Sequence, residues 1–204
     1  MLSARHYLIW GGVLGLVSIT FWLALSSPLL QWREPVYIIA AFAGVFGMGL
    51  MLLQPLLVGG YLPAFEAGRG RKGHRIVGVL LVLSVVVHVV GLWLTSPPDV
   101  VDALLFVSPT PFSAWGVIAM WALFGAALLA SFRQSMRARF RLWRASHTGL
   151  VVVVVFGTVL HAVQIQGTME TISKWTLSIL VILALGRVIF NRRVWALFPL
   201  SNQR

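Results

Sequence analysis

The chain has 204 residues, of which 59% are hydrophobic and only 10% are charged, against roughly 25% charged in a soluble domain. Its mean hydropathy is +0.90. These values exclude a soluble globular protein and indicate an integral membrane protein. The net charge of +11 would suggest nucleic acid in a soluble chain. Here the basic residues lie between apolar runs, where insertion topology explains them, and no nucleic-acid partner is expected. The lack of cysteine excludes disulfides, thiolate catalysis, iron–sulfur ligation and Cys-linked haem.

The apolar runs are about 17 to 22 residues long, which favours helices over a barrel, because lipid offers no partner to an unpaired backbone group. We predict an all-α membrane protein, a six-transmembrane-helix bundle that forms a single domain over residues 1–204 in the lipid bilayer. The predicted spans are 7–26, 36–57, 74–95, 114–132, 146–165 and 175–190. The first span is interpreted as a retained helix rather than a signal peptide. Residues 100–107 are predicted to form a short helix on the membrane surface.

The basic residues fall mainly on one side of these spans. Arg33 and Lys174 lie on one side, and fourteen lie on the other. The fourteen are Arg5, Arg69, Arg71, Lys72, Arg75, Arg133, Arg137, Arg139, Arg141, Arg144, Arg187, Arg192, Arg193 and Arg204. The positive-inside rule makes that side cytoplasmic. We therefore predict a multi-pass protein of the bacterial inner (plasma) membrane with both termini cytoplasmic, in which the third and fifth spans run in the same direction.

Four histidines form two matched pairs on the third and fifth spans. His74 and His88 are 14 residues apart, as are His147 and His161. On an α-helix, 14 residues advance about 21 Å and stop about 40° short of four full turns, so each pair lies on one helix face at two depths. In parallel spans, His74 can face His147 near the cytoplasmic surface, while His88 faces His161 further out. Two facing imidazoles at each level are what two bis-histidine haem irons require as axial ligands.

Other interpretations of these histidines stay open. A membrane histidine can also bond neighbouring helices or belong to a proton relay in a transporter or channel, which would be colourless. Acids expected to partner such a relay all fall in loops; they are Glu34, Glu66, Asp99, Asp102 and Glu170. Zinc is less favoured, because two histidines per level supply too few ligands. The fifth histidine, His6, is interpreted as a solvated or headgroup residue.

Residues around the histidines suit a porphyrin. Residues about one turn from the histidines are often small, such as Gly78 and Gly157. Leu81 and Val154 each follow an inner histidine by seven residues and are expected between the two levels. Basic residues lie where propionates of the inner haem would emerge, although a charge run that only sets topology explains them equally well. These candidates are Arg71, Lys72, Arg75 and Arg144.

The sequence resembles the ferric reductase-like transmembrane domain family, from about the second span to the sixth. The resemblance rests on Leu-Gln-Pro-Leu-Leu at 53–57, His-Arg-Ile-Val-Gly at 74–78 followed by His88, and Trp-Arg-Ala-Ser-His at 143–147 followed by His161. The family includes the membrane parts of NADPH oxidases and ferric-chelate reductases, and the haem subunit of a methionine-sulfoxide-repair system. That subunit departs from the four-histidine pattern, so this chain is more similar to the oxidase and reductase branch.

The resemblance implies two haem b groups held between the third and fifth spans. We expect no counterpart here of the flavin and nicotinamide domain of the oxidases, since no Gly-rich dinucleotide fingerprint follows the sixth span in this sequence. We therefore expect no catalytic residues, a separate cytoplasmic flavoreductase or a membrane quinol as electron donor, and flavin only through a partner. The acceptor at the outer face would be a ferric chelate, oxygen or a periplasmic redox protein. A quinol-linked cytochrome b subunit of a larger oxidoreductase is the alternative within redox chemistry.

Overall fold

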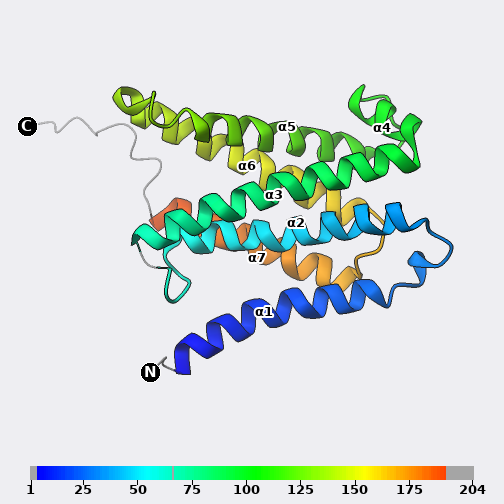
Figure 1. Ribbon diagram of the computed structural model, residues 1–204, viewed down its shortest axis with the longest axis horizontal. Coiled ribbons are helices and arrows are strands. Elements are labelled where there is room, and N and C mark those ends of the chain that lie inside the picture. The colour runs from blue at the N-terminus through cyan, green and yellow to red at the C-terminus, as the bar shows by residue number, and fades with distance from the viewer. Residues whose placement is uncertain (1–3, 66, 192–204) are drawn as a thin grey trace, which may run out of the picture.

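The chain forms a bundle of long α-helices (Figure 1). The computed structural model describes residues 4–65 and 67–191, and these residues contain helices and no strand. The long helices are α1 (Ala4–Leu25), α2 (Pro35–Gly59), α3 (Ala67–Thr95), α5 (Pro111–Ser131), α6 (Phe140–Gln164) and α7 (Thr171–Asn191). All six are long and apolar enough to span a membrane, which confirms the predicted all-α, six-span fold class.

The two helices that carry the paired histidines begin earlier than predicted. α3 begins at Ala67 rather than near residue 74, and α6 begins at Phe140 rather than near residue 146. The predicted starts followed the ends of the apolar runs, but Arg and Lys are good helix formers and can continue a helix beyond the membrane. His74 and His147 therefore each lie two turns inside a helix instead of at its first residue.

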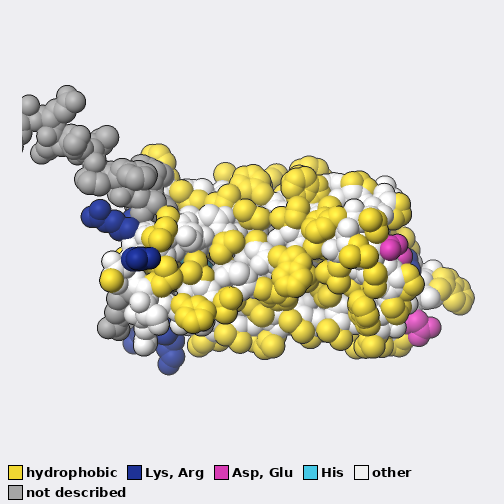
Figure 2. Space-filling model, turned by 90° about the horizontal axis from the view of Figure 1, so that it is seen from above, with side chains coloured by type: hydrophobic (Ala, Val, Ile, Leu, Met, Phe, Trp, Pro, Cys, Tyr) yellow, Lys and Arg dark blue, Asp and Glu magenta, His cyan; other side chains and the backbone are white. Residues whose placement is uncertain are grey.

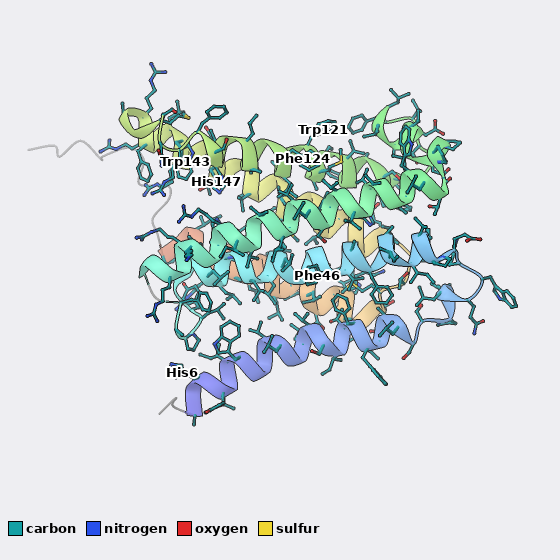
Figure 3. The ribbon with its side chains drawn as sticks, in the orientation of Figure 1. His6, Phe46, Trp121, Phe124, Trp143 and His147 are labelled. Atoms are coloured by element: carbon teal, nitrogen blue, oxygen red, sulfur yellow. The ribbon has the colours of Figure 1, made fainter. Side chains whose placement is uncertain are left out.

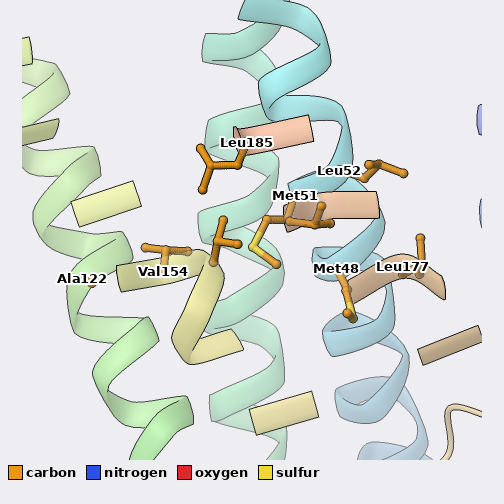
Figure 4. Close-up of a cluster of buried hydrophobic side chains, with 9 residues drawn as sticks. Met48, Met51, Leu52, Ala122, Val154, Leu177 and Leu185 are labelled. Carbon is orange, nitrogen blue, oxygen red and sulfur yellow. The ribbon is translucent and has the colours of Figure 1, made fainter. Parts of the chain in front are cut away.

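The bundle is organised as two helical hairpins joined by α7. α3 packs along α2, and α6 packs along α5, while α7 contacts both α2 and α6. Their shared apolar core is shown in Figure 4. It contains Met48, Met51, Leu52, Ala122, Val154, Val155, Leu177, Val181 and Leu185. This core fixes the two hairpins relative to each other near the middle of the bundle.

The histidine helices are the least buried members of the hairpins. Buried residues make up 17% of the apolar window of α3 and 22% of that of α6, against 44% for α2 and 39% for α7. α1 is peripheral, with 11% buried, and lies at the edge of the bundle (Figure 1). Much of the apolar surface of α3 and α6 is thus left for lipid or for a bound apolar group.

Charge is separated between the two ends of the bundle. Figure 2 shows Lys and Arg side chains at one end, Asp and Glu side chains at the other, and hydrophobic side chains between them. The basic end holds the starts of α3 and α6 and the ends of α2 and α5. Three residues of the predicted basic count, Arg192, Arg193 and Arg204, lie outside the described residues, as does Glu66. This distribution is the one that the positive-inside prediction expects, and the cytoplasmic placement of the basic end stays a prediction.

The short helix predicted for the loop at the acidic end is present, with a shifted range. It forms α4 (Pro97–Leu104) instead of residues 100–107. Ser96 Oγ donates to Asp99 Oδ2 at 2.6 Å in its first turn. Pro97 suits the first helical position, where no backbone N–H is needed, which explains the earlier start.

Glu170 and Lys174 lie where the chain passes from α6 to α7 at the acidic end. Glu170 precedes α7 and accepts the Ser173 backbone N–H at 3.0 Å, and backbone hydrogen bonds from Ile172 and Ser173 hold the pKa of Glu170 below its usual value. Lys174 was predicted in a loop, but it lies in α7, is only 6% exposed, and donates through Nζ to the Ile165 carbonyl. A cation at that carbonyl satisfies the end of α6.

Replacing Lys174 with methionine should therefore lower the free energy of unfolding. The variant keeps the apolar stem and removes a hydrogen bond from a charged donor, a loss of about 1.5–3 kcal/mol. The measurement is unfolding in detergent by a helix-sensitive signal, with Lys72→Met as the control because Lys72 is exposed. Equal stability of the two variants would show that the buried contact contributes nothing.

Candidate functional site

The structure brings together both pairs of histidines that the sequence predicts. His74 of α3 faces His147 of α6, with ring centroids 6.4 Å apart and planes at 78°. His88 of α3 faces His161 of α6, again at 6.4 Å, with planes at 85°. Each level of the bundle therefore holds one imidazole from each hairpin, and the two levels share the same ring separation.

This separation matches a metal held axially between two imidazoles. A ring nitrogen lies about 2.0 Å from a bound metal, so two opposed axial ligands place their ring centroids about 6.3 Å apart. Edge-to-face ring pairs without a metal have centroids about 4.5–7 Å apart, a range that also includes this separation. The spacing is thus compatible with one metal atom between each pair, as in an iron ligated by two histidines, and also with direct edge-to-face contact of the rings.

Backbone carbonyls of the neighbouring helix orient three of the four rings. His88 donates through Nδ1 to Ala40 O and His161 to Phe112 O, both at 2.8 Å, and His74 Nδ1 lies 3.4 Å from Gln54 O. A carbonyl can only accept, so Nδ1 of His88 and of His161 carries the proton and Nε2 is left with a free lone pair. This is the usual way in which a protein orients a metal-binding histidine.

The Gln54 side chain is a second partner of His74. Its carboxamide lies against Nδ1 and the carbonyl of His74, and against the backbone N–H of Gly78. The amide finds a partner at all three positions when its nitrogen donates to His74 Nδ1 and to the His74 carbonyl and its oxygen accepts from the Gly78 N–H, an orientation in which Nδ1 accepts and Nε2 carries the proton. Metal ligation through Nε2 of His74 would require the proton on Nδ1 and the amide turned so that its oxygen faces the ring.

Two glycines make room for the outer rings. A Cβ added at Gly44 would lie 3.0 Å from His88 Nδ1, and one added at Gly116 would lie 2.6 Å from His161 Nδ1. Each glycine is one turn beyond the residue whose carbonyl accepts from the same histidine, Ala40 or Phe112. Neither glycine was predicted as a site residue. A side chain at Gly116 would displace the ring of His161, and one at Gly44 would crowd the ring of His88.

These contacts recur because the two hairpins are built alike. The α2 positions Ala40, Gly44 and Gln54 are matched 72 residues later in α5 by Phe112, Gly116 and Ala126, and the α3 histidines are matched 73 residues later by those of α6. Packing recurs at the same offsets. On α3, Ser84 donates to Ala43 O of α2 at 2.5 Å. The matching residue of α6 is Gly157, and it also lies close to the matching carbonyl of α5: a Cβ added there would be 3.1 Å from Trp115 O.

The inner ring of α6 departs from this repeat. His147 Nδ1 points toward Ala126 O, is buried, and makes no hydrogen bond of normal geometry with the described residues. Instead the ring stacks on Trp143, with centroids 5.4 Å apart and planes at 6°. Figure 3 shows Trp143 and His147 near the basic end of α6, and His6 on α1 across the bundle from them. His6 is thus not part of either pair.

The predicted propionate-binding residues differ in their surroundings. Arg71, Lys72 and Arg75 are exposed at the basic end of α3. Arg144 is half-buried on α6, and its buried Nε has no hydrogen-bond partner among the described residues. A buried guanidinium nitrogen without a partner is costly, so Arg144 is the candidate that most needs an anionic group beside it.

The region between the two levels is apolar. Leu81 and Val154, predicted between the pairs, are each 6% exposed. Within residues 4–65 and 67–191, no three His, Asp or Glu side chains gather as a metal site would require. A metal bound by protein side chains alone takes about four ligands, whereas haem iron needs only its axial ones. The two-histidine levels therefore fit haem better than a bare metal ion.

Comparisons with protein-family models, with curated proteins and with solved structures find no match for this chain.

Proposed function

We propose that this chain is a di-haem b-type membrane cytochrome of the ferric reductase-like kind, which carries electrons across the membrane from a cytoplasmic donor to an acceptor at the outer face. The observation that carries the proposal is the pair of equal 6.4 Å separations between facing histidines on α3 and α6. His74 and His147 would hold an inner haem, and His88 and His161 an outer one. Bound there, each haem would supply one-electron exchange between ferric and ferrous iron.

The protein's own residues would set what this chemistry can do. Histidine ligands from both helices would leave a bound haem iron poorly placed to bind oxygen and suited to electron transfer. The carbonyls of Ala40 and Phe112 keep Nε2 of the outer histidines free for the metal. Buried Leu81 and Val154 exclude water between the two levels, which lie about 21 Å apart along the helices. Arg144 would neutralise a propionate of the inner haem.

The charge distribution supports a direction for transfer. The basic end would face the cytoplasm of a bacterium, in its inner membrane, and would attract an acidic donor such as a separate flavoreductase. The acceptor at the acidic, outer end would be a ferric chelate, oxygen or a periplasmic redox protein. The enzyme activity would then be that of an oxidoreductase component that works with a partner.

Electron transfer across a sealed bilayer tests this function. Purified protein is placed in liposomes that enclose ferricyanide, dithionite is added outside, and absorbance at the ferricyanide band is followed. We expect the enclosed ferricyanide to be reduced faster than in empty liposomes, and His6→Ala to behave as wild type. Variants that lack His88 or His161 should lose the excess rate. Wild-type liposomes that match empty ones would rule out a transmembrane conduit.

A further inference from the structure

We propose that Phe140 and Trp143 form the point at which electrons enter the protein, and that the basic end around them docks an acidic flavoprotein. This inference rests on the proposed di-haem function and names the contact through which its donor acts. The donor's reduced flavin would lose one electron and the inner iron would gain it, passing from ferric to ferrous. The aromatic rings would couple the two groups without being oxidised or reduced themselves.

The structural basis is a column of stacked rings along α6. The Phe140 and Trp143 rings have centroids 5.6 Å apart with planes at 18°, and Trp143 stacks on His147 at 5.4 Å and 6°. His147 in turn faces His74 at 6.4 Å. Phe140 is 42% exposed at the start of the helix. The column thus runs from the protein surface to the inner histidine pair.

Contacts from α5 and from the turn after it hold the middle ring in place. Trp143 Nε1 donates to Leu129 O at 2.9 Å, and the Arg133 guanidinium lies 5.6 Å from the ring centroid of Trp143. A tryptophan with its N–H bonded and a cation over its face is fixed in orientation. The stacking on His147 is therefore a defined part of the structure rather than one rotamer of a free side chain.

The column breaks the repeat between the two hairpins. The α3 positions that match Phe140 and Trp143 are Ala67 and Gly70. Gly70 is buried, and a Cβ there would lie 2.5 Å from the carbonyls of Leu57 and Phe65, so no ring fits. Only one half of an otherwise repeated arrangement carries the rings, and it does so at the basic end. Ordinary packing of a repeated hairpin does not require this difference.

The surrounding charge selects the class of donor. Seven exposed basic side chains lie at the start of α3, in the connection after α5 and at the start of α6: Arg69, Arg71, Lys72, Arg75, Arg133, Arg139 and Arg141. The described acids lie at the other end (Figure 2). So many cations, spread over two hairpins, exceed what one phosphate of a free flavin needs and fit the acidic face of a protein.

The test separates docking from electron entry, with flavodoxin, a small FMN-containing protein, as the probe. Stopped-flow absorbance follows haem reduction by reduced flavodoxin, and fluorescence anisotropy follows binding of labelled oxidised flavodoxin. Trp143→Leu should slow reduction about tenfold, with haem content and flavodoxin Kd unchanged, because it removes the ring that couples donor and acceptor. Trp143→Phe should keep most of the rate. Trp121→Leu, at a 58% exposed tryptophan of α5, is the matched control and should reduce at the wild-type rate.

Binding of flavodoxin to the basic end is tested with a separate variant, and this measurement does not require haem. The triple variant Arg133→Gln, Arg139→Gln, Arg141→Gln should raise the flavodoxin Kd about tenfold at low salt, as should raising the salt concentration for wild type. The same Kd measured on the His74→Ala, His147→Ala protein, which lacks the inner haem site, should equal that of wild type. A colourless wild type would refute the di-haem function, while this binding arm would still decide whether the basic end docks an acidic flavoprotein.

Three results would overturn the inference. The first is a wild-type rate of haem reduction in Trp143→Leu. The second is reduction by free reduced FMN that is as fast as by flavodoxin and insensitive to salt, which would make free flavin the donor. If Trp143→Leu loses haem, Phe140→Leu decides instead: the exposed ring should matter by about threefold, and an unchanged rate is the third contrary result.

Discussion

Replacing His88 with alanine is expected to remove one haem and to leave the other in place. His88 pairs only with His161 at its level, and the inner pair of His74 and His147 lies about four turns away along the helices. The haem content by pyridine haemochrome should fall from about two per chain to about one, since an iron that loses one of two axial ligands is held too weakly to survive purification. His147→Ala should also lose one haem, from the other level.

His6→Ala is the control for these variants, because His6 lies on α1 away from both pairs. Redox titration should show different midpoint potentials for the haem that remains in His88→Ala and in His147→Ala. Loss of both haems in either single variant, or of neither, would contradict two independent sites.

Replacing Gly116 with alanine should disrupt the outer site without touching a ligand. The new Cβ would lie 2.6 Å from His161 Nδ1, so the ring must shift, and we expect its hydrogen bond to Phe112 O to weaken. We expect the free energy of unfolding to fall by about 1–3 kcal/mol from overpacking. We also expect the outer site to hold less haem, as measured by haem absorbance per chain.

Gly125→Ala on the same helix is the matched control, because its Cβ would meet Leu150 at an ordinary 3.7 Å. Gly44→Ala should have an intermediate effect, since its Cβ would lie 3.0 Å from His88 Nδ1. We therefore expect Gly116→Ala to lose the most haem, Gly44→Ala to lose less, and Gly125→Ala to lose the least. An outer site that tolerates Gly116→Ala as well as Gly125→Ala would show that the glycine is not needed for the histidine to reach its carbonyl.

The spans and the histidine pairing could be predicted because they depend on local periodicity. Fourteen residues return a helix nearly to the same face, so His74 and His88 had to share a side of α3 wherever that helix packed. The parallel direction of α3 and α6 followed from counting spans. The same arithmetic placed Leu81 and Val154 between the levels, and both are buried.

The supporting contacts could not be predicted, because they depend on which helices pack together. The sequence alone does not place Ala40 and Gly44 beside His88, or Phe112 and Gly116 beside His161, until α2 is known to pack on α3 and α5 on α6. The repeat between the hairpins becomes visible only after that pairing. Lys174 was misplaced for a related reason: a charged residue between apolar runs suggests a loop, but this one ends α6 from within α7.

One signal in the sequence was readable and was missed. Trp143 precedes His147 by four residues, a spacing that places side chains on the same face of a helix. Phe140 lies a further turn back. The predicted start of the helix near residue 146 excluded both aromatic residues from it, so the stacked column could not be anticipated.

The reduced-minus-oxidised absorption spectrum of the purified protein, expressed with ample haem and quantified as pyridine haemochrome, tests the haem sites most directly. The facing histidine pairs predict a b-type spectrum with about two haems per chain. A colourless protein under the same conditions would contradict haem ligation and would favour a histidine relay in a transporter or channel.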